Sequence, residues 1–561
     1  MAMHSEGTVS SMSSPTSSAS TERKVILASS LGTMFEWYDF FLAGALAAQI
    51  SAAMFSGVNP TAGFIFTLLS FAAGFAVRPF GALVFGRIGD IVGRKYTFMV
   101  TIALMGVSTF AIGLLPSYSQ IGIAAPILFV LMRMLQGLAL GGEYGGAVVY
   151  VAEHAENKHR GAKTAWIQST AALGLLLSLA VILPTRYILG EDQFMAWGWR
   201  IPFLVSLLLL IISLRVRLAL HESPEFERIK REGTTSKAPI SEAFGQWKNM
   251  RLVLLALFGM VMGQAVVWYA GQFYTMFFLT QTLKVDGGTA NAMIIVATIV
   301  TTPFYVLFGK LSDRIGRKPV FLAGCLLAAV FLFPLFKALT HYANPALEHA
   351  QQSAPIVVQA NSKDCNFQFN PVGTAEFLSS CDIARSAIAK AGLNYTSAPL
   401  ATGDTAKIIV GKTVIDSYVG GGADAAAKQK ELTAAIAAAL TANGYAIGAA
   451  DPSQINKPMT VLILIILMLF GTMTYGPIAA MLVELFPSRI RYTAMSLPYH
   501  IGIGWFGGFL PAATFAISAA AGDIYAGLWY PVILAGACFV ICALCVRESR
   551  HVDIFTMHDP Q

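Results

Sequence analysis

The stretch GRIGDIVGRKYT, residues 86–97, decides the fold because a second copy, GKLSDRIGRKPV, occurs at residues 309–320. Each copy has a glycine, then an aspartate four residues later, and then Gly-Arg-Lys. Each copy also follows one long apolar run and precedes the next. A motif that recurs in the same position relative to the apolar runs indicates two related halves within one chain.

A second pair of segments supports the repeat and locates an insertion. EYGGAVVYVAEHAENKHRG (143–161) aligns with TYGPIAAMLVELFPSRIRY (474–492), so that Tyr144 stands opposite Tyr475. The motif and this segment are much further apart in the second half than in the first, so the second half carries additional chain between them. A polar, Ala/Gly-rich stretch without a spanning run, residues 339–457, lies at that place.

The composition predicts a membrane protein. Hydrophobic residues make up 55% of the 561 residues, and charged residues only 12%, far below the share of a soluble chain. Apolar runs long enough to cross a bilayer as a helix recur along the chain. The fold class that we predict is an all-α polytopic membrane protein with twelve transmembrane helices in two six-helix bundles, plus a small α/β extracytoplasmic insert. The predicted spans are 25–50, 62–86, 97–115, 123–150, 163–186, 199–218, 251–281, 289–309, 319–338, 458–484, 493–520 and 526–546.

These spans divide the chain. The predicted parts are a disordered cytoplasmic tail (1–22), an N-terminal six-helix bundle (23–218), a cytoplasmic linker (219–250), a C-terminal bundle in two parts (251–338 and 458–547), the periplasmic insert (339–457) and a second cytoplasmic tail (548–561). Within the insert, 405–421 has strand character and 425–445 predicts a helix. Cys365 and Cys381 would pair as a disulfide in an oxidising periplasm; the alternative is two unrelated thiols.

The net charge of +7 is distributed as in a membrane protein rather than a nucleic-acid-binding protein. Lys and Arg gather in alternate short loops, whereas the loops near 51–61 and 116–122 contain none. Positive residues concentrate on the cytoplasmic side of a membrane, so twelve spans place both termini in the cytoplasm. We therefore expect a lipid bilayer, and no nucleic acid, as a partner.

The repeated motif suggests a contact that holds two bundles together. Its aspartate lies where a helix ends, so that the carboxylate can cap a neighbouring helix and pair with the arginine of its own loop. Such contacts form only when the bundles close on the cytoplasmic side, and we interpret the motif as a gating latch. The alternative is a basic membrane anchor, which would not need an aspartate in both copies. The predicted gating residues are Gly86, Asp90, Gly93, Arg94, Lys95, Gly309, Asp313, Gly316, Arg317 and Lys318.

This motif, between spans two and three, resembles the loop motif of the major facilitator superfamily. Five further segments are similar to the metabolite:proton symporter family within it: EWYDF (36–40), RPFGALVFGRIGD (78–90), RMLQGLALGGEYGGA (133–147), EHAENKHRGAKTAW (153–166) and ELFPSRIRYTAMS (484–496). The resemblance covers nearly the whole chain except the N-terminal tail and the insert. It implies a proton-coupled carrier related to those for shikimate, α-ketoglutarate, citrate, and proline or betaine. It also implies that a first-span acid pairs with a fourth-span arginine.

Five charged residues lie inside predicted spans of the first half: Glu36, Asp39, Arg78, Arg133 and Glu143. A charge inside the bilayer is costly and marks a functional site. From their depths we expect Arg133 to pair with Asp39 or Glu36, and Arg78 to pair with Glu143. Three acids against two bases leave one acid without a cation, which in a low dielectric can bind and release a proton. The alternative is a buried network that only holds helices together.

The second half has polar and aromatic residues in its spans in place of charges. The candidate wall of a cavity between the two bundles comprises Tyr38, Tyr144, Trp268, Tyr269, Gln272 and Tyr475. A guanidinium such as that of Arg133 can hold a substrate carboxylate through two nitrogens at once. Taken singly, each aromatic residue is better explained by packing than by ligand binding.

These features predict a secondary active transporter of the bacterial inner membrane that imports a small organic acid or zwitterion with a proton. Two alternatives remain open: proton-driven efflux of a small compound, and a receptor on a transporter scaffold. The insert motivates the second alternative, because it offers a surface to an unknown periplasmic partner. Zinc-ligand spacings, Walker loops and nucleophile elbows do not occur in the sequence, so we expect no metal, no cofactor and no enzymatic activity.

Overall fold

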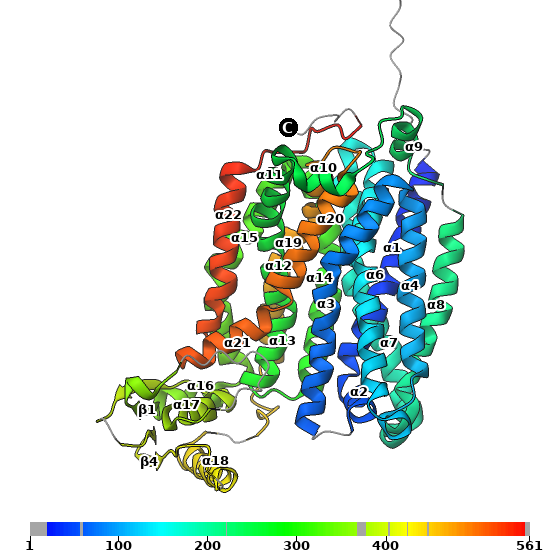
Figure 1. The fold of residues 1–561 in the computed structure, drawn as a ribbon. Coiled ribbons are helices and arrows are strands. Elements are labelled where there is room, and N and C mark those ends of the chain that lie inside the picture. The colour runs from blue at the N-terminus through cyan, green and yellow to red at the C-terminus, as the bar shows by residue number, and fades with distance from the viewer. Residues whose placement is uncertain are drawn as a thin grey trace, which may run out of the picture.

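The structure is a computed structural model that describes residues 19–56, 60–219, 221–366, 377–401, 404–422, 424–445 and 448–555. The predicted N-terminal tail lies outside these ranges up to residue 18, and the end of the C-terminal tail lies outside them from residue 556. Two bundles of long helices stand side by side, and a small α/β insert lies at one end (Figure 1). This arrangement confirms the predicted fold class.

The first bundle and the linker are helical. The bundle contains α1 (Ala19–Ala45), α2 (Ala47–Met54), α3 (Pro60–Ile91), α4 (Arg94–Leu114), α5 (Tyr118–Ile121), α6 (Ala124–His154), η1 (Asn157–His159), α7 (Arg160–Gln193), η2 (Phe194–Gly198) and α8 (Arg200–Leu218). The linker carries α9 (Pro224–Arg231) and α10 (Pro239–Gly245). Ser223 caps α9 by accepting a hydrogen bond from the backbone N–H of Phe226.

The second bundle is interrupted by the insert. Its helices are α11 (Trp247–Ala256), η3 (Leu257–Val261), α12 (Met262–Tyr269), η4 (Ala270–Tyr274), α13 (Thr275–Phe277), η5 (Phe278–Thr282), α14 (Gly287–Ile315), α15 (Arg317–Ala343), α19 (Lys457–Val483), α20 (Arg491–Ile501), η7 (Gly502–Gly507), α21 (Leu510–Ala521), η8 (Ala526–Leu528) and α22 (Trp529–Cys545). α15 continues to Ala343, past the predicted end of span nine at residue 338.

Ten helical segments in the described ranges are long and apolar enough to cross a membrane, and they correspond to predicted spans three to twelve. α1, with 27 residues, and α3, with 32, run alongside them in the first bundle (Figure 1). Glu36, Tyr38 and Asp39 all lie within α1.

Two membrane segments of the second bundle are not regular α-helices. The π-helical turns η3, η4 and η5 interrupt the seventh segment, and η7 separates α20 from α21. Such turns are frequent at functional sites. Gly507, at the end of η7, lies against Tyr269, whose ring is 2.6 Å from where a Cβ would stand. Only glycine permits this close approach of the two segments.

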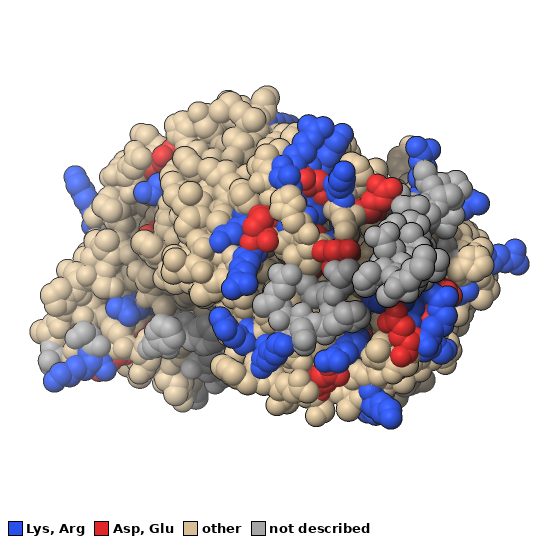
Figure 2. All heavy atoms as spheres, turned by 90° about the horizontal axis from the view of Figure 1, so that it is seen from above, with Lys and Arg blue, Asp and Glu red and all other residues tan. Residues whose placement is uncertain are grey.

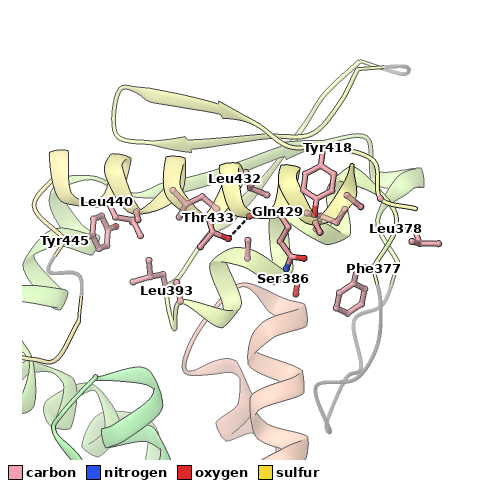
Figure 3. Close-up of a pocket in the computed structure, with 18 of the residues that line it drawn as sticks. Phe377, Leu378, Ser386, Leu393, Tyr418, Gln429, Leu432, Thr433, Leu440 and Tyr445 are labelled. Carbon is pink, nitrogen blue, oxygen red and sulfur yellow. Dashed lines mark hydrogen bonds between the residues drawn. The ribbon is translucent and has the colours of Figure 1, made fainter. Parts of the chain in front are cut away.

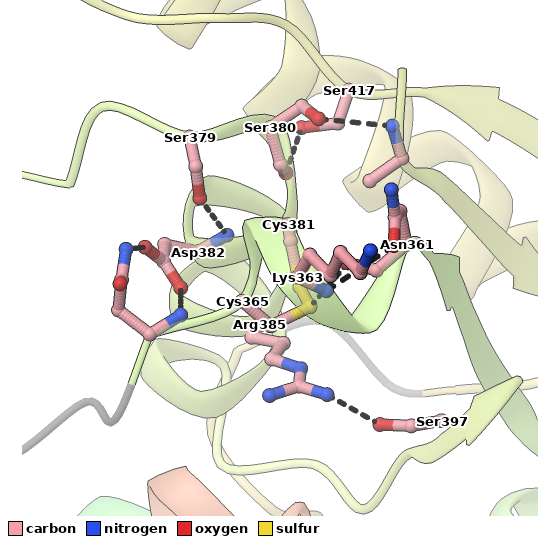
Figure 4. The surroundings of a disulfide bond; sticks show 12 residues. Asn361, Lys363, Cys365, Ser379, Ser380, Cys381, Asp382, Arg385, Ser397 and Ser417 are labelled. Atoms are coloured by element: carbon pink, nitrogen blue, oxygen red, sulfur yellow. Dashed lines mark hydrogen bonds between the residues drawn. A yellow bond between two sulfur atoms is a disulfide. The ribbon is translucent and has the colours of Figure 1, made fainter. Parts of the chain in front are cut away.

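The insert is a small α/β unit. It comprises α16 (Pro345–Ser353), β1 (Ile356–Ala360), η6 (Ser362–Asp364), α17 (Ser380–Lys390), β2 (Thr396–Pro399), β3 (Lys407–Val410), β4 (Thr413–Asp416) and α18 (Ala425–Ala442). The sheet has the order β2-β1-β3-β4, in which β1 pairs parallel with β2 and antiparallel with β3. Cys365 and Cys381 form a disulfide beside Asp382, which accepts two hydrogen bonds from Asn366 (Figure 4).

Backbone hydrogen bonds anchor the insert on the second bundle. The N–H of Tyr395 donates to the carbonyl of Gly522 at 2.7 Å. The side chain of Asn394 accepts from the N–H of Ile524, also at 2.7 Å. On the other side, the N–H of Ala450 donates to the carbonyl of Lys284 at 2.8 Å. The insert is therefore fixed to α21 and to the loop after η5, both of the second bundle.

The opposite end of the molecule is charged. Figure 2 shows this face, where Lys and Arg side chains are spread over the surface with Asp and Glu among them. The two copies of the repeated motif contribute to it, since α3 and α14 both end there (Figure 1).

Candidate functional site

The first copy of the repeated motif joins the two bundles at the charged end. Asp90 pairs with Arg94, with 2.9 Å between Oδ1 and Nη1. Asp90 Oδ2 also accepts hydrogen bonds from the backbone N–H of Thr493, at 2.9 Å, and from its hydroxyl, at 2.7 Å. Because Thr493 lies in the first turn of α20, a carboxylate of the first bundle caps a helix of the second.

The second copy makes equivalent contacts, from the second bundle to the first. Asp313 Oδ1 lies 2.5 Å from Arg317 Nη1. The carboxylate accepts hydrogen bonds from the backbone N–H groups of Gly161 and Ala162, each at 2.8 Å, at the start of α7. A Cβ on Gly309 would stand 2.6 Å from the carbonyl oxygen of Gly161, so a larger residue would push the two bundles apart.

In each half of the chain, a further carboxylate outside the motif adds an ion pair between the bundles. Glu153, at the end of α6, lies 3.1 Å from Arg491 of α20. Glu484, which follows α19, lies 2.9 Å from Arg160 of α7 and 3.2 Å from Arg317. All of these side chains are buried, so water screens the pairs little.

One further acid follows the last helix of each bundle, and these two acids occupy equivalent places. Glu222, after α8, accepts hydrogen bonds from the backbone N–H of Lys95 at 3.2 Å. Glu548, after α22, accepts from the backbone N–H groups of Arg317 and Lys318 at 2.9 and 3.0 Å. Each acid caps the helix that begins with Arg-Lys. Burial raises the pKa of Glu222, whereas the N–H donors and the nearby Arg94 lower it.

In the middle of the first bundle, two buried arginines share one aromatic ring. The guanidinium carbon of Arg78 lies 4.4 Å from the ring centre of Phe40 and 4.1 Å from that of Phe75. The guanidinium carbon of Arg133 lies 5.2 Å from the same Phe40 ring. Cation–π contacts stabilise both cations, but a ring does not neutralise their charge. Nε and Nη2 of Arg78 have no hydrogen-bond partner in the described part of the chain.

A cavity of about 10 Å³ beside Arg78 lies between the two bundles. Its lining includes Glu36 and Tyr144 from the first bundle, and Tyr499 and His500 from the second. Neither carboxylate oxygen of Glu36 and neither ring nitrogen of His500 has a hydrogen-bond partner among the described residues. Buried polar atoms without partners are costly, so a water, an ion or a chemical role is expected at this place. The volume is that of a single water molecule.

From their depths we expected Asp39 or Glu36 to pair with Arg133. Asp39 does not pair with Arg133 directly. Its carboxylate accepts a hydrogen bond from the Ser206 hydroxyl at 2.5 Å and lies beside Thr109. Gln136 donates to the Thr109 hydroxyl at 2.6 Å and accepts from Arg133 at 2.5 Å. Two polar side chains therefore connect the acid to the arginine, and no ion pair joins Arg133 to Asp39 or Glu36 in the described ranges.

The predicted pairing of Glu143 with Arg78 is wrong. Glu143 pairs with Arg217 of α8 at 2.8 Å, and Arg217 also donates to the carbonyl of Phe98 at 3.1 Å. Arg217 lies at the end of the predicted span 199–218, and its long side chain turns into the bundle. The expected count of three acids against two bases becomes three against three. Glu36 still has no hydrogen-bond partner among the described residues.

Aromatic side chains from both bundles meet beside the small cavity. The rings of Tyr144 and Tyr499 stack with 3.5 Å between their centres and 3° between their planes. The hydroxyls of Tyr475 and Tyr499 lie 2.7 Å apart. Trp268 donates from Nε1 to the Tyr305 hydroxyl at 2.6 Å, and its ring lies 5.7 Å from Tyr475. The second bundle therefore presents an aromatic wall to the charges of the first.

The other predicted wall residues are placed in different ways. The ring of Tyr269 lies 6.4 Å from Phe75, at the arginine cluster of the first bundle. Gln272 is next to the Tyr305 hydroxyl. Tyr38 points away, because its hydroxyl donates to the carbonyl of Pro202 on α8 at 2.7 Å. Tyr38 therefore belongs to the packing of the first bundle and not to the wall.

Comparison with known proteins assigns the family. The sequence pattern of the sugar (and other) transporter family matches residues 24–242 and 225–358. The chain belongs to the sugar (and other) transporter family. The matched part of the chain ends in β1 at the start of the insert. The membership confirms the resemblance that the repeated motif suggested.

Two transporters with assigned names are similar in sequence. The proline/betaine transporter of Salmonella typhimurium is 37% identical over 321 residues, which cover 56% of this chain and 64% of that protein. The shikimate transporter of Escherichia coli is 35% identical over 330 residues, which cover 58% and 74%. The chain thus spans about two thirds of the length of these relatives, 64% of the first.

A solved transporter shares the fold. The E. coli proton:xylose symporter XylE, bound to 6-bromo-6-deoxy-D-glucose, superposes with a TM-score of 0.59 over 95% of this chain and 97% of that chain. The two sequences are 14% identical, so the likeness concerns the fold alone.

Sequence reasoning missed several residues of this candidate site. Three residues that contact the predicted site residues were not themselves predicted: Arg217, Tyr305 and Tyr499. The repeat contains a signal for Tyr499, because it stands opposite Gln168 when the alignment of Tyr144 with Tyr475 is continued. Gln168 donates to the Tyr144 hydroxyl at 2.8 Å, just as Tyr499 bonds to Tyr475.

Proposed function

We propose that this chain is a secondary active transporter that imports a small organic acid or zwitterion together with a proton. The observation that carries the proposal is the pair of buried arginines that both contact the Phe40 ring, near the Glu36 carboxylate, which has no hydrogen-bond partner among the described residues. Two cations close together in a low dielectric repel each other, and an anion between them would relieve this. A carboxylate fits best, because guanidinium groups bind it bidentately.

The aromatic wall suggests the other end of the substrate. Trp268, Tyr475 and Tyr499 can face a quaternary or protonated amine with their ring faces. A zwitterion would then place its carboxylate at the arginines of the first bundle and its cation at the rings of the second. Proline and betaine have this chemistry, and shikimate has the carboxylate alone. The names of the similar transporters agree with this class of substrate.

Glu36 is our candidate for the proton-binding residue. Its carboxylate is buried without a hydrogen bond among the described residues, so the neutral acid is the stable form in this closed state. Opening of the seam between the bundles would admit water and allow the proton to leave. Asp39, which has the Ser206 hydroxyl as a donor, is the second candidate. Arg78 links the proton site to the substrate site, since it lines the cavity of Glu36.

We infer that alternating access occurs by rocking of the two bundles about this centre. The two copies of the motif act as latches, which hold the charged end closed in the state described. The basic residues at that end favour a cytoplasmic location for it and for both termini. The insert then faces the periplasm of a bacterial inner membrane, where its disulfide is stable.

Uptake into proteoliposomes tests the proposal. Radiolabelled glycine betaine, proline and shikimate are offered with the exterior at pH 6 and the interior at pH 7.5, and again without the gradient. We expect at least one to accumulate above its external concentration only with the gradient. Accumulation that ignores the gradient would refute the coupling to protons. Loss of preloaded substrate driven by the same inward proton gradient would indicate proton-driven efflux instead.

The variant Glu36→Gln separates coupling from binding. It should abolish accumulation while preserving exchange of internal for external substrate, because the site stays intact and permanently neutral. Asp39→Asn is the matched change one turn away. If Asp39→Asn alone gives this pattern, the proton site is Asp39 rather than Glu36.

A further inference from the structure

The insert contains a cavity that the transport site does not use. Its volume is about 830 Å³, within the range of pockets that bind small organic molecules. It lies between α17 and α18, and it reaches the second bundle at Thr282 and Asn344. Figure 3 shows Leu432 and Leu440 of α18 along one side, with Leu393 opposite and Phe377 and Leu378 at one end.

The lining is mostly apolar with a few polar groups. Gln429 of α18 extends toward Ser386 of α17, and Thr433 lies one turn further along α18 (Figure 3). The Thr433 side chain lies on the exposed side of the helix, and its hydroxyl donates to the carbonyl of Gln429 at 2.7 Å. Tyr418 contributes an aromatic ring to the lining. An apolar body and a few fixed polar groups are the usual composition of a ligand site.

Lys284 is the single charged residue among the described residues of the lining. It is half-buried, and no carboxylate lies within ion-pair distance of its ammonium in the described ranges. Burial lowers the pKa of Lys284, as expected for a cation that has lost water without gaining an anion. The cavity therefore offers one positive charge and no negative one.

The backbone holds Lys284 in an unusual conformation. Its φ of 56° is the one positive value at a residue other than glycine in the part of the chain that the structure describes. Residues with a side chain adopt this region at an energetic cost, and such strain is concentrated at ligand sites. The hydrogen bond from Ala450 to the carbonyl of Lys284, at 2.8 Å, keeps the residue at the junction of insert and bundle.

We propose that this cavity binds a small amphipathic organic anion, with its acid group at Lys284 and its apolar body along α18. The cavity is distinct from the proposed transport site, which lies between the bundles at Arg78 and Arg133. Its ligand also differs in chemistry, because a compact zwitterion such as betaine would leave the apolar lining unfilled. The insert is thus a ligand-binding module fixed to one bundle of a transporter.

Calorimetric titration of the full chain in lipid nanodiscs tests the proposal. The probes are 4-phenylbutyrate and its uncharged analogue 4-phenylbutan-1-ol, and empty nanodiscs give the background for partition into lipid. We expect saturable binding of the acid, tighter than that of the alcohol by about tenfold, since one charge-assisted contact is absent in the alcohol. Equal affinities of the two probes, or no saturable binding of the acid, would overturn the proposal.

Two pairs of variants locate the site. Lys284→Gln should weaken the binding of the acid about tenfold and leave the binding of the alcohol unchanged. Lys412 is an exposed lysine of the insert, and Lys412→Gln should change the binding of neither probe. Ala437→Trp fills the cavity and should abolish binding of both probes, whereas Ala438→Trp, on the exposed side of α18, should not. Unchanged binding in Lys284→Gln or in Ala437→Trp would overturn the assignment. Loss of binding in Arg133→Gln would do so as well, since it would place the probe in the transport site.

Discussion

The two halves of the molecule share their closing contacts but not their centres. Asp90 and Asp313 each pair with the arginine four residues later and cap a helix of the other bundle. The centres differ at the positions that the repeat equates. Arg78 corresponds to Thr301 when the two copies of the motif are aligned, and the second pair of segments equates Glu143 with Thr474 and Arg133 with Leu464.

The difference teaches which parts the proposed rocking motion would constrain. A closing contact between two related bundles is made twice, once from each side, so both copies keep the same chemistry. A site that binds one asymmetric substrate has no such requirement. Thr301 and Thr474 satisfy their hydroxyls within their own helices, on the carbonyls of Ala297 and Gly471, at 2.8 and 2.9 Å. The second half thus has neutral side chains where the first half has charged ones.

The largest expected effect is on stability, at the ion pair that the second half lacks. Arg217→Gln leaves Glu143 buried without its cation and should reduce the free energy of unfolding by about 3–5 kcal/mol. The double variant Glu143→Gln/Arg217→Gln should recover much of this loss, because neither charge remains. Thr474→Val, at the equivalent position in the second half, should cost less than about 1 kcal/mol. Unfolding in mixed micelles with increasing SDS measures all three, and a double variant no more stable than Arg217→Gln would contradict the explanation.

The next effect is on transport, at the arginine pair. Arg78→Gln and Arg133→Gln should each reduce uptake at low substrate concentration about 100-fold, because a buried charge-assisted contact to the substrate is worth about 2–5 kcal/mol. Thr301→Val, in the position equivalent to Arg78, is the matched control and should change uptake less than about threefold. Initial rates in proteoliposomes with equal amounts of folded protein provide the measurement. Near-normal uptake in both arginine variants would show that the substrate binds elsewhere.

The sequence could predict what depends on repetition and hydropathy. The two aligned pairs of segments defined two bundles and located the insert. The spacing of Asp90 and Arg94 predicted a carboxylate that caps a helix of the other bundle. These features are local or recur, so that each copy supports the other. The pairings inside the first bundle were predicted less well, because depth along a span does not give the direction in which a side chain points. Asp39 and Glu143 both turn toward α8, where they contact Ser206 and Arg217.

Other features could not be predicted because they depend on contacts between distant segments. The stacking of Tyr144 on Tyr499 joins a residue of the first bundle to one of the second. The local sequence around either tyrosine does not predict this contact. The π-turns of the seventh segment arise in an apolar stretch with no proline. The cavity of the insert is formed by α17, α18 and the loop after η5, three segments that the sequence does not connect.

A smaller effect should come from the latches, and it should be alike in the two copies. Asp90→Asn and Asp313→Asn each remove a charged helix cap and one ion pair, and each should favour the open charged end by about 1–2 kcal/mol. Spin labels at Tyr96 and Ile315, which are exposed on α4 and α14, report the distance between the bundles at this end once exposed Cys545 is replaced by serine. We expect a longer distance to become populated in both variants. A shift in only one of them would break the symmetry that the repeat implies.

The smallest effect should distinguish the two tyrosines that the repeat equates. Tyr144 accepts its hydrogen bond from Gln168 within the first bundle, and Tyr475 shares its bond with Tyr499 within the second, at 2.8 and 2.7 Å. Tyr144→Phe and Tyr475→Phe each remove one neutral hydrogen bond, worth about 1 kcal/mol, and should raise the KM of uptake about fivefold or less. The stack of Tyr144 on Tyr499 persists in both variants, because it involves the rings and not the hydroxyls. If the wall faces the cationic end of a zwitterion, Tyr475→Phe should affect betaine more than shikimate, whereas Tyr144→Phe should affect both equally. Equal effects of Tyr475→Phe on the two substrates would mean that the aromatic wall contributes packing alone, and the division of roles between the bundles would then rest on the arginines.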